Sequence, residues 1–279
     1  MDTQAMTYDS NGYLIVPDAS LYYEVKGQGP TLILIPGANG DAVIFAPIRA
    51  FLSKNFRVVT YDRRGFSHST LNDGYDFKDR LSDDADDVAA LIAHLSDDGK
   101  AYVLGSSSGA IVALKTLLTH ADKIELLVSH EPPAIELFGN KGNWGDFFRQ
   151  VHKTYETEGM KAAMIEFVSG NIDEKDAAAM QNKDLDPNSQ AAKNSKYWFD
   201  HELPVYPYTK WTTTDFKPYK NKLLLANGLD SESYFTTFAN LNLSKDLGLS
   251  ILSVPGGHLG YAFDPQPFSE ILTSALLNK

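Results

Sequence analysis

The segment with the clearest capacity for chemistry is Gly105-Ser106-Ser107-Ser108-Gly109. An apolar run, residues 101–104, precedes it, and the apolar helical pattern AIVALKTLL follows it. A sharp turn between a strand and a helix lifts its middle serine above the sheet, and glycines beside it let the two elements pack closely. The pattern therefore predicts Ser107 as a nucleophile, with Ser106 and Ser108 as its flanking residues.

A serine hydroxyl is a weak nucleophile until a base accepts its proton, and histidine is the side chain suited to that task. Among seven histidines, His258 lies in a glycine-rich segment, residues 254–260, that follows the last predicted strand. Ligands of open α/β folds bind at the carboxyl ends of the strands. We therefore expect His258 to be the base; the alternative is a solvent-exposed turn histidine.

A carboxylate must orient the imidazole and stabilise its charged form, and two positions compete for that role. Asp230 follows the penultimate predicted strand and gives the chain order Ser, Asp, His. Glu131 follows the strand that comes after the helix at Ser107, and topology places that strand beside the nucleophile's strand. Each has a simpler explanation: Asp230 as the cap of a helix over residues 231–241, and Glu131 as a buried loop carboxylate. The residues alone leave both open.

Stabilisation of an oxyanion requires N–H donors that point into the same cleft. The segment Ile35-Pro36-Gly37-Ala38-Asn39-Gly40 follows a buried strand and consists mostly of small residues. We expect one donor to be the N–H of Ala38 and the other that of Ser108, with Gly37 at the substrate. The alternative is a tight turn without a catalytic role.

The elements that must position these residues follow an alternating pattern. Apolar runs at residues 31–35, 57–61, 101–104, 126–129, 223–226 and 251–254 predict strands buried on both faces, and residues 12–16 and 21–26 predict a hairpin. Helical patterns separate the later runs, so we expect an α/β fold with a mostly parallel, eight-stranded sheet and helices on both faces. Residues 134–218 show helical patterns and no buried strand. They are predicted to be a helical cap after the sixth strand, with residues 1–133 and 219–279 as the core domain.

Composition narrows the range of partners. The formal net charge of −11 disfavours nucleic acid and anionic membranes, and the absence of cysteine excludes disulfides and thiolate chemistry. The first residues, MDTQAMTYDSNGYLIV, lack the pattern of a signal peptide, so a soluble, cytoplasmic protein is expected, a monomer or a homodimer. The aspartates at 83, 84, 86 and 87 are interpreted as a solvated helix start rather than a metal site.

These residues together resemble the α/β-hydrolase superfamily along almost the whole chain. The matching segments are Pro36-Gly37, Tyr61-Asp62-Arg63-Arg64-Gly65, the serine motif, Asp230 and Gly257-His258. A serine at position 107, where dehalogenases and epoxide hydrolases of the family carry aspartate, argues against those activities. The chain also lacks the His-Gly-Gly-Pro-Gly run of proline iminopeptidases. A narrower resemblance is to fungal zearalenone lactone hydrolases, and it is carried by Ser106-Ser107-Ser108-Gly109-Ala110, His130-Glu131-Pro132 and residues 232–235. It implies Glu131 as the acid. Those hydrolases lack the usual aspartate, whereas this chain keeps Asp230, so the choice between Glu131 and Asp230 stays open.

The expected function is hydrolysis of a small apolar carboxylic ester or lactone through an acyl-enzyme, with no metal and no cofactor. Trp144, Phe148 and Trp198 are expected to bind substrate, although aromatic residues at helical spacing are more often core. The alternatives are a ligand-binding protein with an idle triad, and a carbon–carbon bond hydrolase or perhydrolase that uses the same residues.

Overall fold

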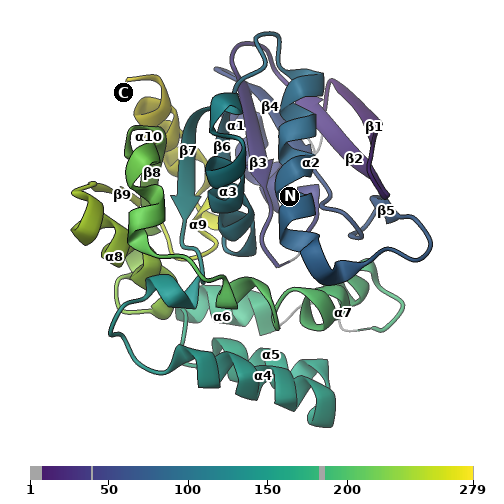
Figure 1. The fold of residues 1–279 in the computed structure, drawn as a ribbon, viewed down its shortest axis with the longest axis vertical. Coiled ribbons are helices and arrows are strands. Elements are labelled where there is room, and N and C mark those ends of the chain that lie inside the picture. Colours follow the sequence, from purple (N-terminus) through teal and green to yellow (C-terminus); the bar gives the residue numbers. More distant parts are fainter. Residues whose placement is uncertain (1–7, 39, 182–185, 279) are drawn as a thin grey trace.

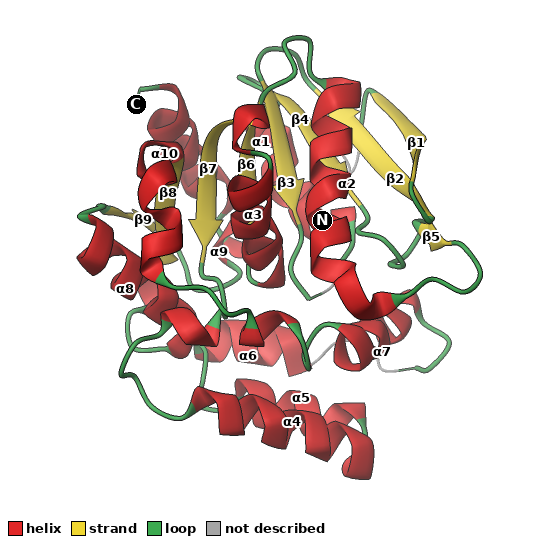
Figure 2. Ribbon diagram, in the orientation of Figure 1, coloured by secondary structure: helices red, strands yellow, loops and turns green. Residues whose placement is uncertain are grey.

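The computed structural model describes residues 8–38, 40–181 and 186–278. Within them, nine strands form one sheet in the order β1-β2-β4-β3-β6-β7-β8-β9, with the short β5 paired to β2 (Figures 1 and 2). The strands are β1 Ser10–Val16, β2 Ala19–Lys26, β3 Thr31–Ile35, β4 Arg57–Tyr61, β5 Thr70–Leu71, β6 Ala101–Ser106, β7 Ile124–His130, β8 Leu223–Gly228 and β9 Ile251–Val254. From β4 across to β9 neighbouring strands are parallel, and β1, β2 and β5 are antiparallel. The predicted α/β class with a mostly parallel sheet is confirmed; the ninth strand, β5, is an addition.

Two apolar layers explain why the central strands are hydrophobic throughout. In β3 the alternate residues Ile33 and Ile35 belong to one core and Leu32 and Leu34 to the other. The first core packs against α2 (Arg80–Leu95), α3 (Ser108–Thr119) and α8 (Phe238–Leu247). The second packs against α1 (Ala46–Leu52), α9 (Gly260–Phe263) and α10 (Pro265–Leu277). Because each face of the sheet is covered, strand side chains of both directions must be apolar.

Among the described residues, four α-helices lie between β7 and β8 in the chain. They are α4 (Trp144–Glu158), α5 (Met160–Val168), α6 (Glu174–Gln181) and α7 (Gln190–His201). Figure 1 shows them below the end of the sheet toward which β3 and β7 point, which is the carboxyl end of the parallel strands. We refer to residues 134–218 as the inserted segment. No helix in the described ranges combines the length and apolar character needed to cross a membrane.

Two local expectations from the sequence need correction. The solvated helix start is right only for Asp83, which lies in the first turn of α2, and for the exposed Asp86; Asp84 and Asp87 are instead buried and paired with arginines. The helix expected over residues 231–241 is instead a pair of short 3-10 turns followed by α8, which begins at Phe238. In that arrangement Asp230 lies within the first turn, Leu229–Ser231, and does not cap a long helix.

Candidate active site

Ser107 lies at a strained turn between β6 and α3. Its backbone has φ 57° and ψ −126°, and its N–H donates to the carbonyl of His130 at 3.0 Å. A Cβ at Gly109 would lie 2.2 Å from the carbonyl oxygen of Ile35, and one at Gly105 would lie 2.3 Å from the carbonyl oxygen of Gly109. Both positions therefore need glycine so that the helix can approach the strands this closely. A non-glycine residue with positive φ costs free energy and is found mainly at functional sites.

His258 is held by Glu131. The carboxylate Oε2 of Glu131 lies 2.7 Å from Nδ1 of His258, and its Oε1 accepts the N–H of Gly228 at 2.8 Å. Glu131 comes directly after β7, has φ 50° and is fully buried, while His258 lies in the loop after β9 and is also buried. The two residues meet because β7, β8 and β9 are neighbouring parallel strands whose carboxyl ends lie at one edge.

Electrostatic interactions lower the pKa of Glu131 and raise the pKa of His258, so the pair consists of a carboxylate and a basic imidazole. Burial alone would raise the pKa of Glu131, but the hydrogen bond and charge of His258, the neighbouring His130 and the N–H of Gly228 outweigh it and lower that pKa to about 2. Burial alone would lower the pKa of His258, but the hydrogen bond and charge of Glu131, with the charge of Asp176, raise it above the ordinary 6.5. An imidazole held in this way is suited to accept a proton from a hydroxyl at Nε2, since Nδ1 faces the carboxylate.

Asp230 is placed differently. It is exposed, in the 3-10 turn that follows β8, and its N–H donates to the carbonyl of Gly256 at 3.0 Å. The structure brings Glu131, and not Asp230, to the ring of His258.

The segment expected to supply an oxyanion donor lies against the serine. A Cβ at Gly37 would be 2.9 Å from the Cβ of Ser107, so the backbone of this loop approaches the serine closely. Ser108 is the first residue of α3, and the first N–H groups of a helix have no acceptor within the helix. Ala38 is half-buried beside Gly37, and Asn39 lies outside the described residues.

Ser107 and His258 share a mostly apolar pocket of about 450 Å³. The described residues that line it are Gly37, Ala38, Asp41, Val43, Ile44, Pro47, Ser107, Ala179, Met180, Ala191, His258, Leu259, Tyr261, Ala262 and Phe263. The predicted Gly37 and Ala38 are thus at the pocket. Ala179, Met180 and Ala191, from the inserted segment, were missed by the sequence analysis because small and flexible side chains carry no distinctive pattern.

The three aromatic residues expected to bind substrate are outside this lining set. Trp144 and Phe148 pack in an aromatic cluster with Phe235 and their neighbours. Trp198 is buried, and its indole Nε1–H donates to the hydroxyl oxygen of Ser108 at 3.2 Å. The contact of Trp198 is therefore with the residue after the serine, and a role of all three in substrate binding stays a prediction.

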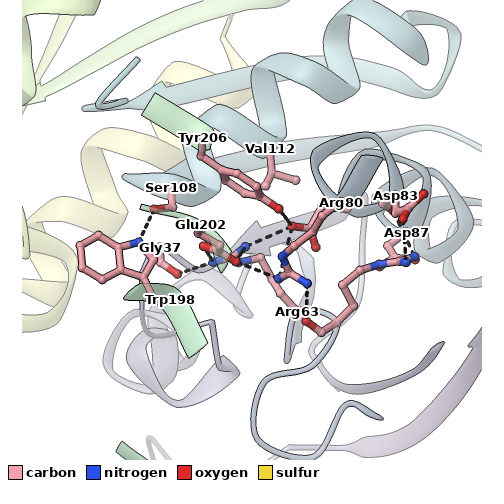
Figure 3. Close-up of polar contacts among 12 residues, drawn as sticks. Gly37, Arg63, Arg80, Asp83, Asp87, Ser108, Val112, Trp198, Glu202 and Tyr206 are labelled. Atoms are coloured by element: carbon pink, nitrogen blue, oxygen red, sulfur yellow. Dashed lines mark hydrogen bonds and ion pairs between the residues drawn. The ribbon is translucent and has the colours of Figure 1, made fainter. Parts of the chain in front are cut away.

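A buried group of four charges lies beside this site (Figure 3). Arg63, which follows β4, donates to both carboxylate oxygens of Glu202 at 2.7 and 2.8 Å and to Asp84 at 3.2 Å. Arg80 donates to Glu202 at 2.8 Å, and the hydroxyl of Tyr206 donates to Asp84. Two positive and two negative charges balance, which offsets part of their desolvation.

This group connects the inserted segment to the loop beside Ser107. Glu202 and Tyr206 belong to residues 134–218, while Arg63, Arg80 and Asp84 belong to the part of the chain before it. Arg63 also donates to the carbonyl oxygen of Gly37 at 2.8 Å (Figure 3). The position of the Gly37 backbone is thus tied to charges from two parts of the chain.

His130 is a further residue of the site that the sequence analysis did not single out. It is fully buried at the end of β7, its Nδ1 lies 2.9 Å from the hydroxyl oxygen of Ser106, and its ring centre is 6.2 Å from that of His258. Burial lowers the pKa of His130 to about 4, so its ring is neutral near pH 7. The sequence signal that could have indicated His130 is its position directly before Glu131, a candidate acid.

Comparison with known proteins identifies the family of this chain. Residues 30–163 match the family described as the alpha/beta hydrolase fold. The chain is 32% identical to the uncharacterised hydrolase YraK of Bacillus subtilis over 276 residues, which cover 96% of each chain. It is 25% identical to the zearalenone hydrolase of Bionectria ochroleuca over 257 residues, which cover 89% of this chain and 90% of the relative.

A solved structure shows the same fold at lower sequence identity. The enol-lactonase from Burkholderia xenovorans superposes with a TM-score of 0.67 at 20% identity, over 96% of this chain and 100% of that one. With a whole-length relative of this similarity and a matching family pattern, the chain belongs to the α/β-hydrolase family and is a hydrolase of that fold.

Proposed function

We propose that the protein is a serine hydrolase that cleaves a carboxylic ester or lactone through Ser107, His258 and Glu131. The observation that carries this proposal is the 2.7 Å hydrogen bond between His258 and Glu131, beneath a pocket that His258 shares with Ser107. A buried carboxylate with a lowered pKa that orients an imidazole is the arrangement that activates a serine hydroxyl. Between the two candidate acids, the contacts favour Glu131.

The proposed cycle has two halves. His258 accepts the hydroxyl proton of Ser107 at Nε2 while Oγ attacks the carbonyl carbon, and the N–H groups of Ala38 and Ser108 stabilise the oxyanion. His258 then donates that proton to the departing alcohol oxygen, which leaves an acyl-enzyme. Water, deprotonated by the same nitrogen, adds to the acyl carbon, and the proton returns to Oγ of Ser107 as the acid leaves.

The substrate class follows from the lining of the pocket. Most of the lining residues are apolar, and none of the described ones is a lysine or an arginine, so the pocket is suited to a neutral substrate with apolar surface. The names of similar proteins, a zearalenone hydrolase and an enol-lactonase, support a lactone among the candidate substrates. Ala179, Met180 and Ala191 come from residues 134–218, which supports their role as a cap over the pocket.

The first test is turnover of p-nitrophenyl acetate and butyrate and of a lactone panel by wild-type protein and Ser107→Ala. Wild-type turnover is expected, with a loss of several orders of magnitude in Ser107→Ala. Ser274→Ala, on the exposed side of α10, is the matched control and should behave as wild type. If folded wild-type protein hydrolyses none of these compounds, or if Ser107→Ala keeps the activity, the proposal is wrong.

A further inference from the structure

A second buried carboxylate reaches the loop that carries His258, and it comes from the inserted segment. Asp176 lies in α6 and is only 1% exposed. Its Oδ2 accepts the N–H of Leu259 at 3.2 Å, and within the described parts of the chain its buried Oδ1 has no hydrogen-bond partner. A carboxylate so buried and only half satisfied is costly, and it calls for a reason beyond packing.

The main chain of the His258 loop is shaped to admit this carboxylate. A Cβ at Gly257 would lie 2.3 Å from Oδ2 of Asp176 and 3.1 Å from Cβ of Asp173. A side chain at position 257 would therefore displace the Asp176 carboxylate or crowd Asp173. The glycine before His258 leaves room for the carboxylate of α6 beside the loop.

Asp176 lies beside the pocket rather than in its described lining. It is not among the described residues that line the pocket, but Ala179 and Met180, about one turn further along the same helix, are. One face of α6 thus contacts both the pocket and the loop of the base. A displacement of α6 would change the pocket wall and the support of His258 together.

We propose that Asp176 is a positioning residue for His258, through which helix α6 couples the placement of the inserted segment over the pocket to the competence of the base. Glu131 holds the imidazole through Nδ1, while Asp176, from the inserted segment, holds the main chain of the loop through the N–H of Leu259. The inference rests on the proposed function for the role of His258 as base. The contact and its effect on the imidazole are independent of that function.

Several groups face the imidazole or its loop from the elements packed around them. They are Glu131 and His130 at the end of β7, Asp173 and Asp176 of the α6 region, Tyr261 of α9, and the Lys175–Asp264 ion pair beside Gly256. His130 is neutral near pH 7, because its pKa is lowered to about 4, chiefly by burial. The charges nearest the ring are then the carboxylates of Glu131 and Asp176, and both raise the pKa of His258 against the opposite effect of burial.

The direction of the pH effect follows from these charges. Burial raises the pKa of Asp176, and the charge of His258 and the N–H of Leu259 oppose that rise. Where Asp176 is ionised, its charge stabilises the imidazolium form of His258. Replacing it with a neutral amide must therefore lower the pKa of His258.

The experiment is a titration of the His258 ring by NMR in full-length wild-type protein, Asp176→Asn and Glu174→Gln, with His258→Asn to assign the resonance. Asp176→Asn keeps an acceptor oxygen for the N–H of Leu259 and replaces the other carboxylate oxygen with an NH2 group, which removes the negative charge at nearly the same shape. We expect its His258 midpoint to fall by about half a pH unit or more. Glu174→Gln removes the same charge from an exposed position of α6 and should leave the midpoint unchanged. Equal midpoints in wild type and Asp176→Asn overturn the inference, whether or not the protein hydrolyses esters.

Kinetics then tests positioning separately from charge. On p-nitrophenyl butyrate at a pH above the titration of His258, Asp176→Ala is expected to lower kcat about tenfold to a hundredfold with little change in KM. Asp176→Asn should recover most of that loss, because its carbonyl oxygen still accepts the N–H of Leu259. A kcat for folded Asp176→Ala equal to that of wild type contradicts the positioning role. If Asp176→Ala does not fold, the titration of Asp176→Asn decides. Absence of turnover in wild type, with the shifted midpoint present, counts against the proposed function alone.

Discussion

At the scale of single residues, Glu131 combines two features that folding alone would not favour. It has a backbone φ of 50°, and its charge is fully buried. A non-glycine residue in such a conformation costs about 1–3 kcal/mol, and an unpaired buried carboxylate costs several more. Both are offset by the hydrogen bonds from Gly228 and with His258, and the conformation directs this carboxylate at the imidazole.

We predict that Glu131→Gln is far more harmful to ester hydrolysis than Asp230→Asn. The amide keeps the shape but loses the charge that stabilises the imidazolium, so kcat should fall about 10³–10⁴-fold. Because Glu131 raises the pKa of His258, wild-type kcat/KM should rise with pH through a midpoint above 6.5, and that midpoint should be lower in Glu131→Gln. Steady-state kinetics from pH 5 to 9 measures both effects.

Asp230→Asn is the matched control for that experiment. The side chain of Asp230 is exposed, and the ring of His258 is held by Glu131 instead. The kcat/KM of Asp230→Asn should therefore be within about twofold of wild type, as expected for a surface substitution. A larger loss in Asp230→Asn than in Glu131→Gln would assign the acid to Asp230 and contradict the geometry.

The sequence identified candidates for this site better than it could choose between them. The glycines around Ser107 and His258 mark turns of special conformation, which a pattern can reveal. Glu131 and Asp230 follow neighbouring parallel strands, β7 and β8, so topology places both at one edge of the sheet. What distinguishes them is the direction of each side chain, which for Glu131 follows from a positive φ that no local pattern of residues announces.

At the scale of elements, the central strands were predicted well because burial on both faces demands continuous apolar runs. The two-residue β5 was missed, since so short a strand has no period. The start of α2 was misjudged because solvated acids and buried, paired acids look alike in sequence. Arg64 is nearly fully buried and lies 2.6 Å from Asp87, and Arg63 is paired with Asp84. Asp84 and Asp87 are thus the counter-charges of the two arginines that follow β4.

The buried charges around Arg63 lead to a stability prediction. Glu202→Ala removes the carboxylate that accepts three hydrogen bonds from Arg63 and Arg80, so these two buried cations lose one of their counter-charges. Breaking a buried ion pair in this way costs about 3–5 kcal/mol, so the free energy of unfolding should fall by about that amount. Urea unfolding followed by circular dichroism measures it.

Glu158→Ala, at the exposed end of α4, is the control for the loss of a glutamate from the inserted segment. It should change the free energy of unfolding by less than about 0.5 kcal/mol. If Glu202→Ala also changes the free energy of unfolding by less than about 0.5 kcal/mol, the charges around Arg63 rearrange or admit water at little cost in free energy.

At the scale of the whole molecule, charge and pocket favour the same kind of substrate. The formal net charge is −11, and the only formally charged lining residue of the described pocket, apart from the titratable His258, is Asp41. Asp41 accepts hydrogen bonds from Asn194 of the inserted segment at 2.9 Å and from Ser67 at 3.2 Å. A substrate that carries a carboxylate thus meets a repulsive field on approach and finds no lysine or arginine in the described lining of the pocket.

We therefore predict discrimination between p-nitrophenyl butyrate and the p-nitrophenyl monoester of succinic acid, which adds one negative charge at similar size. At about 0.01 M salt the neutral ester should have a kcat/KM at least about tenfold higher, because charges act over about 30 Å. At about 0.15 M salt the screening length falls to about 8 Å, and kcat/KM for the anion should rise while that of the neutral ester stays level. If salt does not narrow the difference in kcat/KM between the two esters, the discrimination arises inside the pocket, where screening is weak. If both esters are hydrolysed equally well, neither the overall charge nor the apolar lining selects the substrate.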